Sequence, residues 1–435
     1  MQSPALRVLG RPVPILLALV ATTSVMAQGA RPSSESASPP IDWRSAEAGI
    51  LTNQTQLTFR DRFVKAGESY FSPDGRRIIF QAVEQPTDER EPDEFYAMFV
   101  ADLITAAESD GAPRWQLENI RRVSPTGSAN TCGWFHPIDP DRILFATTIG
   151  PPTASDPPGF QRGTSRYRWS FPPEMRIVEA KLSELPLVPL AAEAKPGDPS
   201  DIPTNLLRLL AGDGRAYVAE GSISNDGRTL LFCSLETNEG DLFVKDLESG
   251  SITPLVMAPG YDGGPFFSPT GDRICYRSDR RGNNQLQLYV ADLERDAEGR
   301  VIGATTEYAV TANSDVNWCP YWHPAGEHLV YASSAVGHRN YEIFVVDARS
   351  DDGAVPPQRR YGTNPRRITF ADGADVLPVF DSTGAIMMWT SQRHDDRSSQ
   401  VWIADFVMPL EPRTSDPGVG RVGGEAAPAN GGAAR

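Results

Sequence analysis

The sequence predicts an all-β protein, a six-bladed β-propeller, and three observations carry this prediction. One pattern, an aromatic-rich strand followed by a tight turn and an apolar strand, occurs six times along the chain. Glycine and proline number 37 and 38 of 435 residues, which favours many turns over long helices. A third and a fourth strand follow most copies, and four strands make one propeller blade of about 40–50 residues plus loop insertions. The six copies span residues 70–80, 134–145, 222–232, 266–276, 321–331 and 379–388.

The turn inside each copy explains why the pattern repeats. In the first copy it reads Ser72-Pro73-Asp74-Gly75. Proline presets its own φ angle, aspartate hydrogen-bonds the nearby backbone, and glycine takes the left-handed position. A β-sandwich has no reason to repeat one such turn six times. Radially stacked blades repeat it and leave no long exposed edge.

Ring closure is expected to use both ends of the chain. The last copy ends after its third strand, at residues 401–406, and the missing outer strand appears ahead of the first copy, at residues 56–59. We therefore expect this N-terminal outer strand to pair with the last blade. The pairing would remove an unpaired strand edge, which is an aggregation hazard.

The segments outside the ring differ from it in composition. Arg7 and Arg11 precede a short apolar run, and small residues follow at a cleavage site, which is the pattern of a signal peptide. The run is too short to cross a bilayer core of about 30 Å, so cleavage is favoured over anchoring. We expect a signal peptide at 1–27, a linker at 28–50, the propeller at 51–408 and a disordered tail at 409–435. This organisation predicts export to the periplasm or to the extracellular space.

The net charge of −15 limits the classes of partner. A negative field repels nucleic acid and anionic membrane surfaces. No segment after the signal peptide is apolar for long enough to span a membrane. A neutral or cationic protein or peptide is therefore the expected partner.

The turn at residues 72–75, with an aromatic residue before it and an apolar strand after it, resembles the WD40-like repeat of TolB-type propellers. The blade ending at residues 287–292, Gln-Leu-Tyr-Val-Ala-Asp, is similar to that repeat as well. The resemblance covers about residues 51–408 and implies a propeller that acts through partners at the cell envelope. TolB proteins carry an α/β domain before the propeller. A short linker stands in that place here, so we expect the propeller part only.

Histidines are not expected to form a catalytic or metal site. His136 and His323 occupy the same position of the repeat, and we expect both to cap the turn between two strands because their blades are half a ring apart. The sequence contains no His-Glu-x-x-His spacing and no Gly-x-Ser-x-Gly nucleophile motif. No catalytic residue, metal ligand or cofactor is therefore predicted.

The four cysteines are interpreted as buried thiols of the blade cores. Cys132 and Cys319 hold equivalent places on the inner strands of blades two and five. Across the ring they are too far apart for the Cα separation of about 7 Å that a disulfide allows. A bridge between Cys275 and Cys319 of neighbouring blades stays open as an alternative, and Cys233 is the fourth thiol.

Three aspartates recur just before the inner strands of blades four, five and six. They are Asp262, Asp315 and Asp375. The loop in which they lie opens on the face where propellers usually gather ligands. One interpretation is an acidic surface for a cationic peptide or a metal. The other, which turn chemistry favours, is that each carboxylate caps its own loop backbone.

The segment that differs most from the repeat is 151–173, between the second and third strands of blade two. By strand direction it opens on the same face as the three aspartates, and it combines arginines with aromatic residues, the types enriched at binding hot spots. Its expected binding residues are Arg162, Arg166, Tyr167, Arg168 and Trp169. Long loops in compact domains are more often functional than idle. The alternative is a loop that folds over the channel and packs there.

These features together predict a monomeric, non-catalytic binding platform for a protein or peptide at the cell envelope. A channel enzyme acting on glycans or peptides is one alternative, and it would require acids, or histidines with a metal, converging in the channel. A purely structural envelope protein is the other, and it is favoured if the loop at 151–173 packs down and leaves no accessible concavity.

Overall fold

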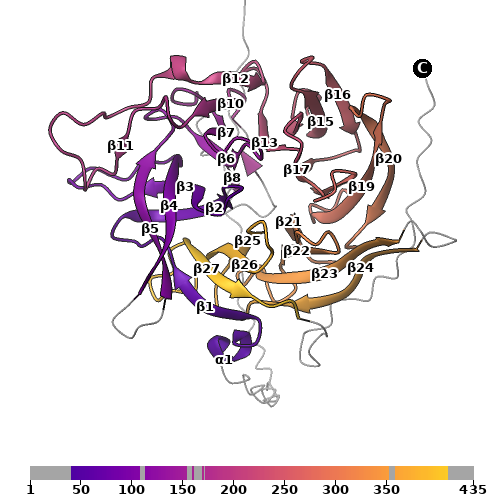
Figure 1. The fold of residues 1–435 in the computed structure, drawn as a ribbon. Helices are drawn as coiled ribbons and strands as arrows, with labels where there is room; N and C mark the ends of the chain where they lie inside the picture. The colour runs from indigo at the N-terminus through magenta and orange to yellow at the C-terminus, as the bar shows by residue number, and fades with distance from the viewer. Residues whose placement is uncertain are drawn as a thin grey trace, which may run out of the picture. The chain divides into compact units, whose positions relative to one another are not determined.

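The computed structural model describes residues 41–107, 113–153, 159–160, 169–170, 172–351 and 358–409. The chain divides into two units, residues 1–40 and 41–435, and every described residue belongs to the second unit. In that unit six antiparallel sheets surround one axis (Figure 1). Their innermost strands contact one another in ring order, and the last contacts the first. The six-bladed β-propeller predicted from the sequence is confirmed.

The blades follow the chain, and their strands run in sequence from the axis outward. Blade 1 contains β2 (Phe63–Phe71), β3 (Arg77–Glu84), β4 (Ala97–Ala107) and β5 (Pro113–Arg122), with β11 (Val188–Pro189) at its outer edge; blade 2 contains β6 (Asn130–Phe135), β7 (Arg142–Thr147), β10 (Arg176–Lys181) and β12 (Arg208–Ala211); blade 3 contains β13 (Val218–Ile223), β14 (Thr229–Ser234), β15 (Asp241–Asp246) and β16 (Ile252–Val256). Blade 4 contains β17 (Asp262–Phe267), β18 (Arg273–Ser278), β19 (Gln287–Arg295) and β20 (Val301–Ala309); blade 5 contains β21 (Asn317–Trp322), β22 (His328–Ser333), β23 (Glu342–Asp351) and β24 (Gln358–Arg367); blade 6 contains β25 (Asp375–Phe380), β26 (Ile386–Ser391), β27 (Gln400–Phe406) and, outermost, β1 (Leu51–Gln56). Outside the blades lie the helix α1 (Trp43–Glu47), the 3-10 turn η1 (Thr204–Leu206) and the short pair β8 (Gly159–Phe160) and β9 (Trp169–Ser170).

Blade 6 takes its strands from both ends of the described chain. β1 pairs antiparallel with β27, and Leu51 lies opposite Phe406 while Gln56 lies opposite Trp402. The strand therefore lies on the N-terminal side of the 56–59 segment that the sequence predicted for this role. This pairing gives the last blade the same four strands as blades 3, 4 and 5.

Helix α1 attaches the beginning of the described chain to blade 6. It lies within the 28–50 segment expected as a linker. The side chains of Glu47 and Arg393 are fully buried and form an ion pair of 2.9 Å, and Arg393 forms a second ion pair of 3.0 Å with Asp375. The Arg393 guanidinium also lies 4.5 Å from the ring centre of Trp43. These contacts with a residue 346 positions away order the segment, and its polar composition gives no sign of them.

Blade 2 matches the repeat least well in sequence, yet it has four strands, with β12 paired to β10. Between these two strands the chain makes an excursion to blade 1. There β11 pairs with β5, and Leu182, Leu185, Leu190 and Ile202 join the apolar cluster of blade 1. The excursion covers the outer edge of blade 1, which would otherwise be an unpaired edge.

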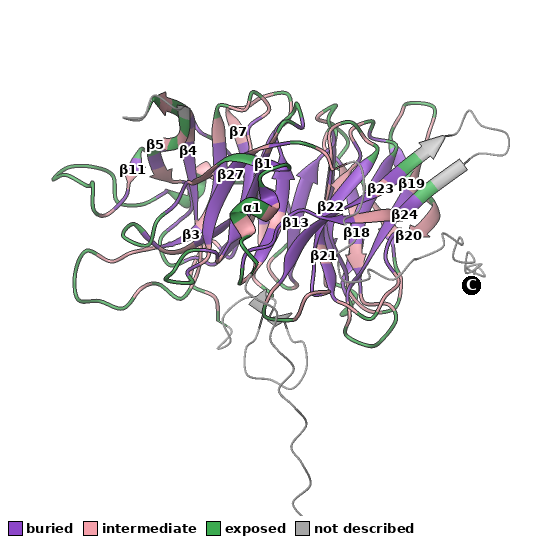
Figure 2. Cartoon of the chain, turned by 90° about the horizontal axis from the view of Figure 1, so that it is seen from below, coloured by how far each residue is buried: buried purple, intermediate pink, exposed green. Residues whose placement is uncertain are grey.

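Apolar side chains fill the space between the blades, and Figure 2 shows that buried residues make up most of the strands. The second strands are almost wholly buried, and every residue of β14 and β22 is buried. Full burial of one large apolar side chain contributes about 1.5–3 kcal/mol. Among the described residues, no helix has the length and apolarity that a membrane crossing requires.

The turns between the first and second strands behave as the repeat predicted. Gly75, in the first turn, has a φ angle of +69°. The Nδ1 atom of His136 accepts a hydrogen bond from the backbone N–H of Asp139 at 3.3 Å, and that of His323 accepts one from Ala325 at 3.2 Å. The expectation that both histidines cap a turn is confirmed.

Candidate functional site at the propeller axis

Every inner strand has the same irregularity, and this irregularity builds the site. The register of each inner strand shifts at one equivalent place, with a further shift near the start of β2, and at that equivalent place one residue has a positive φ angle. A β-bulge of this kind bends the strand and re-aims a side chain. The six bulge residues are Glu68, Cys132, Glu220, Gly264, Cys319 and Leu377, with φ between +44° and +60°. Positive φ is uncommon outside glycine, and such strain clusters at ligand sites.

Side chains from different blades meet at these bulges. The hydroxyl of Thr131, on blade 2, donates a hydrogen bond of 2.9 Å to Oε2 of Glu68, on blade 1. Electrostatic interactions also couple Glu68 with Glu220 on blade 3 and with Cys319 on blade 5. Because these blades surround the axis, the side chains converge on it. The axial cluster consists of Glu68, Thr131, Cys132, Glu220, Tyr261 and Arg277.

A layer of aromatic rings crosses the axis beside the axial cluster. The rings belong to Tyr70, Trp134, Phe266 and Tyr321, each two residues after a bulge residue. Tyr70 and Phe266 come from opposite blades, yet their ring centroids are 5.8 Å apart, and the Tyr70 and Tyr321 centroids are 6.4 Å apart. These separations are typical of favourable aromatic pairs. Trp134, Phe266 and Tyr321 keep partial solvent exposure, so solvent reaches this part of the axis.

The carboxylate of Glu220 is paired with a cation inside the axial cluster. Oε1 accepts hydrogen bonds from Arg277 Nη2 at 2.9 Å and from the Tyr261 hydroxyl at 2.6 Å, and Oε2 accepts one from the backbone N–H of Gly264. A Cβ at position 264 would lie 2.2 Å from Arg277 Nη1, so any larger residue there would displace this guanidinium. Burial by itself would lower the pKa of Arg277, but Glu220 and Tyr261 hold it well above its usual value. The two charges therefore neutralise each other.

Glu68 lies in a different electrostatic environment. Its carboxylate accepts hydrogen bonds from neutral groups, the Thr131 hydroxyl and the Cys132 thiol. Burial raises the pKa of Glu68, and the charge of Glu220 raises it further, while the hydrogen bonds and Arg277 lower it; the net shift is upward. This carboxyl group can therefore hold a proton or bind an incoming cation. Carboxyl groups with shifted pKa values concentrate at functional sites.

The thiols near the axis are held in their neutral form. Burial, and then the charge of Glu68, raises the pKa of Cys132 well above its usual value. A thiol protonated in this way is a poor nucleophile and a poor metal ligand. Cys132 is partly exposed, whereas Cys233, Cys275 and Cys319 are buried, and the four thiols are free. The cluster thus offers one unusual acid together with neutral hydrogen-bond donors.

The three aspartates predicted from the sequence are separated by their own partners. Asp262 begins β17 and forms an ion pair of 3.1 Å with Arg280, and Asp375 begins β25 and pairs with Arg393. Asp315 precedes β21 and is partly buried. No group of three or more His, Cys, Asp or Glu side chains that could hold a metal occurs in the part of the chain that the structure describes.

The stability of the protein at different pH values tests the environment of Asp262. Burial raises the pKa of Asp262 to about 6, although Arg280 and the Ser278 hydroxyl lower it. Between about pH 4 and 6 the native state holds a proton that the unfolded state has released, so this carboxyl makes the free energy of unfolding fall as pH rises. We expect Asp262→Asn to flatten the profile over that interval, as measured by urea denaturation at a series of pH values. The exposed Asp213→Asn should leave the profile unchanged, and an unchanged profile in Asp262→Asn would refute the shift.

The arginine-rich loop predicted as a binding element lies mostly outside the described residues. This applies to Arg162, Arg166, Tyr167 and Arg168, while Trp169 is described only as part of β9. The loop connects β7 to β10. Because β7 runs antiparallel to the inner strand β6, the strand ends that this loop joins, Thr147 and Arg176, lie at the N-terminal face of the ring, where the inner strands begin.

Glu68, Glu220 and Arg277 were not predicted from the sequence. A signal was present in the repeat. Four of the six copies carry an aromatic ring at one position of the inner strand, and Glu68 and Glu220 each stand two residues before that position in their own copy. A glutamate in the middle of an inner strand that has no other charged residue, as in β13, is costly to bury unless it has a partner. The partner of Glu220, Arg277, comes from the second strand of the next blade, which no local pattern reveals.

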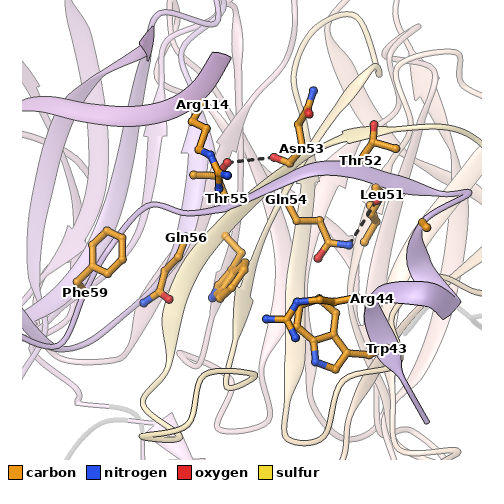
Figure 3. A pocket seen from close by; sticks show the side chains of 12 residues that line it. Trp43, Arg44, Leu51, Thr52, Asn53, Gln54, Thr55, Gln56, Phe59 and Arg114 are labelled. Atoms are coloured by element: carbon orange, nitrogen blue, oxygen red, sulfur yellow. Dashed lines mark hydrogen bonds between the residues drawn. The ribbon is translucent and has the colours of Figure 1, made fainter. Parts of the chain in front are cut away.

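A surface groove of about 650 Å³ lies elsewhere, between α1 and β1 on the outer side of blade 6 (Figure 3). Trp43, Arg44, Phe59 and Trp402 line it together with β1. The Arg44 guanidinium lies 4.2 Å from the ring centre of Trp43, so a cation of the protein itself already packs against that ring. The groove is three strands away from the axis and contains none of the predicted site residues.

Comparison with known proteins gives partial matches in sequence. No family model matches the chain. An uncharacterised protein of Agrobacterium fabrum, Atu1656, is 30% identical over 162 residues, which are 37% of this chain and 45% of that protein. The Tol-Pal system protein TolB of Wolinella succinogenes is 23% identical over 181 residues, which are 41% of this chain and 37% of that protein. The chain thus spans less than half of the length of these curated relatives.

Two solved structures of TolB proteins align with most of this chain, both at TM-scores below 0.5. The structure of a putative TolB from Agrobacterium tumefaciens covers 79% of this chain and 91% of its own, with 15% identity and a TM-score of 0.44. That of TolB from Acinetobacter baumannii covers 78% of this chain and 63% of its own, with 15% identity and a TM-score of 0.41. The chain is thus a six-bladed β-propeller, and parts of its sequence are similar to TolB proteins.

Proposed function

We propose that this protein is a non-catalytic binding platform of the cell envelope that holds a protein or peptide on the N-terminal face of its ring. The observation that supports this most directly is the convergence of strained, polar bulge residues at the axis, where Glu68 lies beside partly exposed aromatic rings. Such residues cost stability, and folded proteins keep them mainly where a ligand is bound.

The N-terminal face also carries loops of different lengths. It carries the loops that precede the inner strands and those that join the second and third strands of each blade, including the loop with β8 and β9. Binding residues are found mainly on loops that a rigid scaffold positions. The binding residues predicted in 151–173 lie mostly outside the described residues, but the strand ends on either side of that segment, Thr147 and Arg176, lie at this face, which supports a binding role for the segment there.

The proposed location and partner class follow from charge and from the predicted signal peptide. The full chain has a net charge of −15, which attracts a cationic partner and does not repel a neutral one. The relative from Wolinella succinogenes is named as a Tol-Pal system protein, which fits a role at the envelope. The propeller would act as a monomer that presents one face.

Site-specific cross-linking tests the proposal. A photoreactive amino acid is placed at exposed positions of the N-terminal face, Asn238 or Asn283, and at exposed positions of the opposite face, Asn225 or Thr383. We expect a discrete cross-linked partner in envelope extract from the first pair and none from the second. Cross-links of equal strength from both faces, or from neither, would overturn the platform, and the channel would then be screened for turnover of glycans and peptides.

A further inference from the structure

We infer that the axial cluster binds one positively charged group, an ammonium or a guanidinium, at Glu68 beside the rings of Tyr70 and Trp134. The inference rests on the proposed function and names the chemistry by which the platform would recognise its partner. A lysine or arginine side chain, or a free amino terminus, carries such a group.

The balance of charge at the axis favours a cationic ligand. Arg277 and Glu220 form an ion pair of 2.9 Å, and the Tyr261 hydroxyl donates a further hydrogen bond to the same carboxylate. Glu68 instead receives its hydrogen bonds from a hydroxyl and a thiol. When Glu68 is ionised the cluster therefore carries a net negative charge. Within the described part of the chain Glu68 forms no ion pair of its own; a partly buried charge in that state is costly, and an incoming cation removes that cost.

The surface beside Glu68 is aromatic, which also favours a cationic ligand. Tyr70 follows Glu68 by two residues, and its ring centroid lies 4.9 Å from that of Trp134. The electron-rich faces of tyrosine and tryptophan attract cations, by about 0.5–2 kcal/mol depending on desolvation. Trp134 and Glu68 are both partly exposed, so a ligand that enters along the axis can touch a ring and the carboxylate together.

An anionic ligand fits the cluster less well. It would have to compete with Glu220 for Arg277, whose guanidinium also donates a hydrogen bond of 2.9 Å to the Tyr261 hydroxyl. Gly264 leaves room for that guanidinium only because it lacks a Cβ. Arg277 is thus held in place as the partner of Glu220, and an anion would also meet the charge of Glu68.

Cation binding should be coupled to proton release. Burial raises the pKa of Glu68, so lowering the pH protonates it and removes the charge that the ligand needs. Tyr70, Cys132 and Cys319 also have raised pKa values and stay neutral near neutral pH, so they do not supply a competing charge. The titratable and charged groups that face Glu68 are Tyr70 on β2, Cys132 on β6, Glu220 on β13, Arg277 on β18 and Cys319 on β21.

The test compares a cation with its neutral analogue. Binding of n-butylammonium and of n-butanol to the chain without residues 1–27 is measured by ligand-observed NMR, with tryptophan fluorescence as a second readout. We expect the ammonium to bind at least about tenfold more tightly, which corresponds to about 1.4 kcal/mol. Glu68→Gln keeps an acceptor for Thr131 and should abolish the difference. Glu248→Gln, at an exposed carboxylate, should keep it, and Trp134→Phe should reduce it.

A pH series provides the second readout. In the wild-type protein the affinity for n-butylammonium should weaken as pH falls, whereas in Glu68→Gln it should be low and independent of pH. Equal binding of the two probes, or a preference that survives in Glu68→Gln with its thermal unfolding unchanged, would overturn the inference. If the cross-linked partner of the N-terminal face is still captured by Glu68→Gln at full strength, the platform stands and the cation site fails. If that face captures no partner, the platform itself fails.

Discussion

Replacing Arg393 by alanine is expected to lower the free energy of unfolding by about 3–5 kcal/mol, because it leaves two buried carboxylates without a counter-charge. Arg393 forms ion pairs with Glu47 at 2.9 Å and with Asp375 at 3.0 Å, and all three side chains are almost completely buried. Its guanidinium also packs 4.9 Å from the ring centre of Trp389. One side chain thus connects helix α1, the start of β25 and the core of blade 6.

Urea denaturation measures the effect, and Arg215→Ala is the matched control. Arg215 is 88% exposed and lies 3.5 Å from Asp213, so its loss should cost less than about 0.5 kcal/mol. Hydrogen exchange should also show loss of protection in α1 and β1 of the Arg393 variant, since Glu47 connects both to the ring. Equal stabilities of the two variants would mean that blade 6 closes without the buried ion pairs.

Replacing Glu220 by alanine is expected to have an effect of similar size, about 3–5 kcal/mol, because Arg277 would be left as an unpaired cation at the axis. The side chains of Glu220 and Arg277 are 7% and 13% exposed, so water compensates little of the loss. The Tyr261 hydroxyl would lose its acceptor as well. The unpaired guanidinium would also repel an ammonium from Glu68, so cation binding should disappear in this variant.

A double variant separates loss of the pair from loss of one partner. Glu220→Ala combined with Arg277→Met removes both charges, and replacing a whole buried pair by apolar groups is often close to neutral. We therefore expect the double variant to be more stable than Glu220→Ala alone. Glu298→Ala, at a carboxylate that is 65% exposed, should cost less than about 0.5 kcal/mol. A double variant less stable than Glu220→Ala would show that Arg277 stabilises the ring through contacts other than this ion pair.

The sequence predicted the six-bladed ring, but it gave no local signal for helix α1 or for the exact position of the outer strand of blade 6. The six turns were found because their signal is local and each uses residues that fix φ angles. Helix α1 was missed because its order depends on Arg393, 346 residues away. The outer strand of blade 6 was expected at 56–59 and lies at Leu51–Gln56, since its register depends on β27 and no repeat signal marks it.

In the candidate site, too, features that depend on local sequence were predicted and features that depend on long-range contacts were not. Histidine caps were predicted because a turn is a local structure. Asp262 and Asp375 were expected as surface groups or loop caps, and each is buried against an arginine that lies 18 residues later in the chain. The axial cluster was not predicted, because Glu68, Thr131 and Arg277 come from blades 1, 2 and 4 and meet only when the ring closes.

By itself, the sequence determined the number of blades, the turn chemistry and the TolB-like resemblance, because each of these depends on residues within one repeat. Only the tertiary structure decided which charges meet at the axis and which carboxylates are neutralised. The physical reason is that a charge acts through space and through the loss of water around it. Both depend on the side chains that neighbouring blades bring together, and the order of residues along one strand does not fix that arrangement.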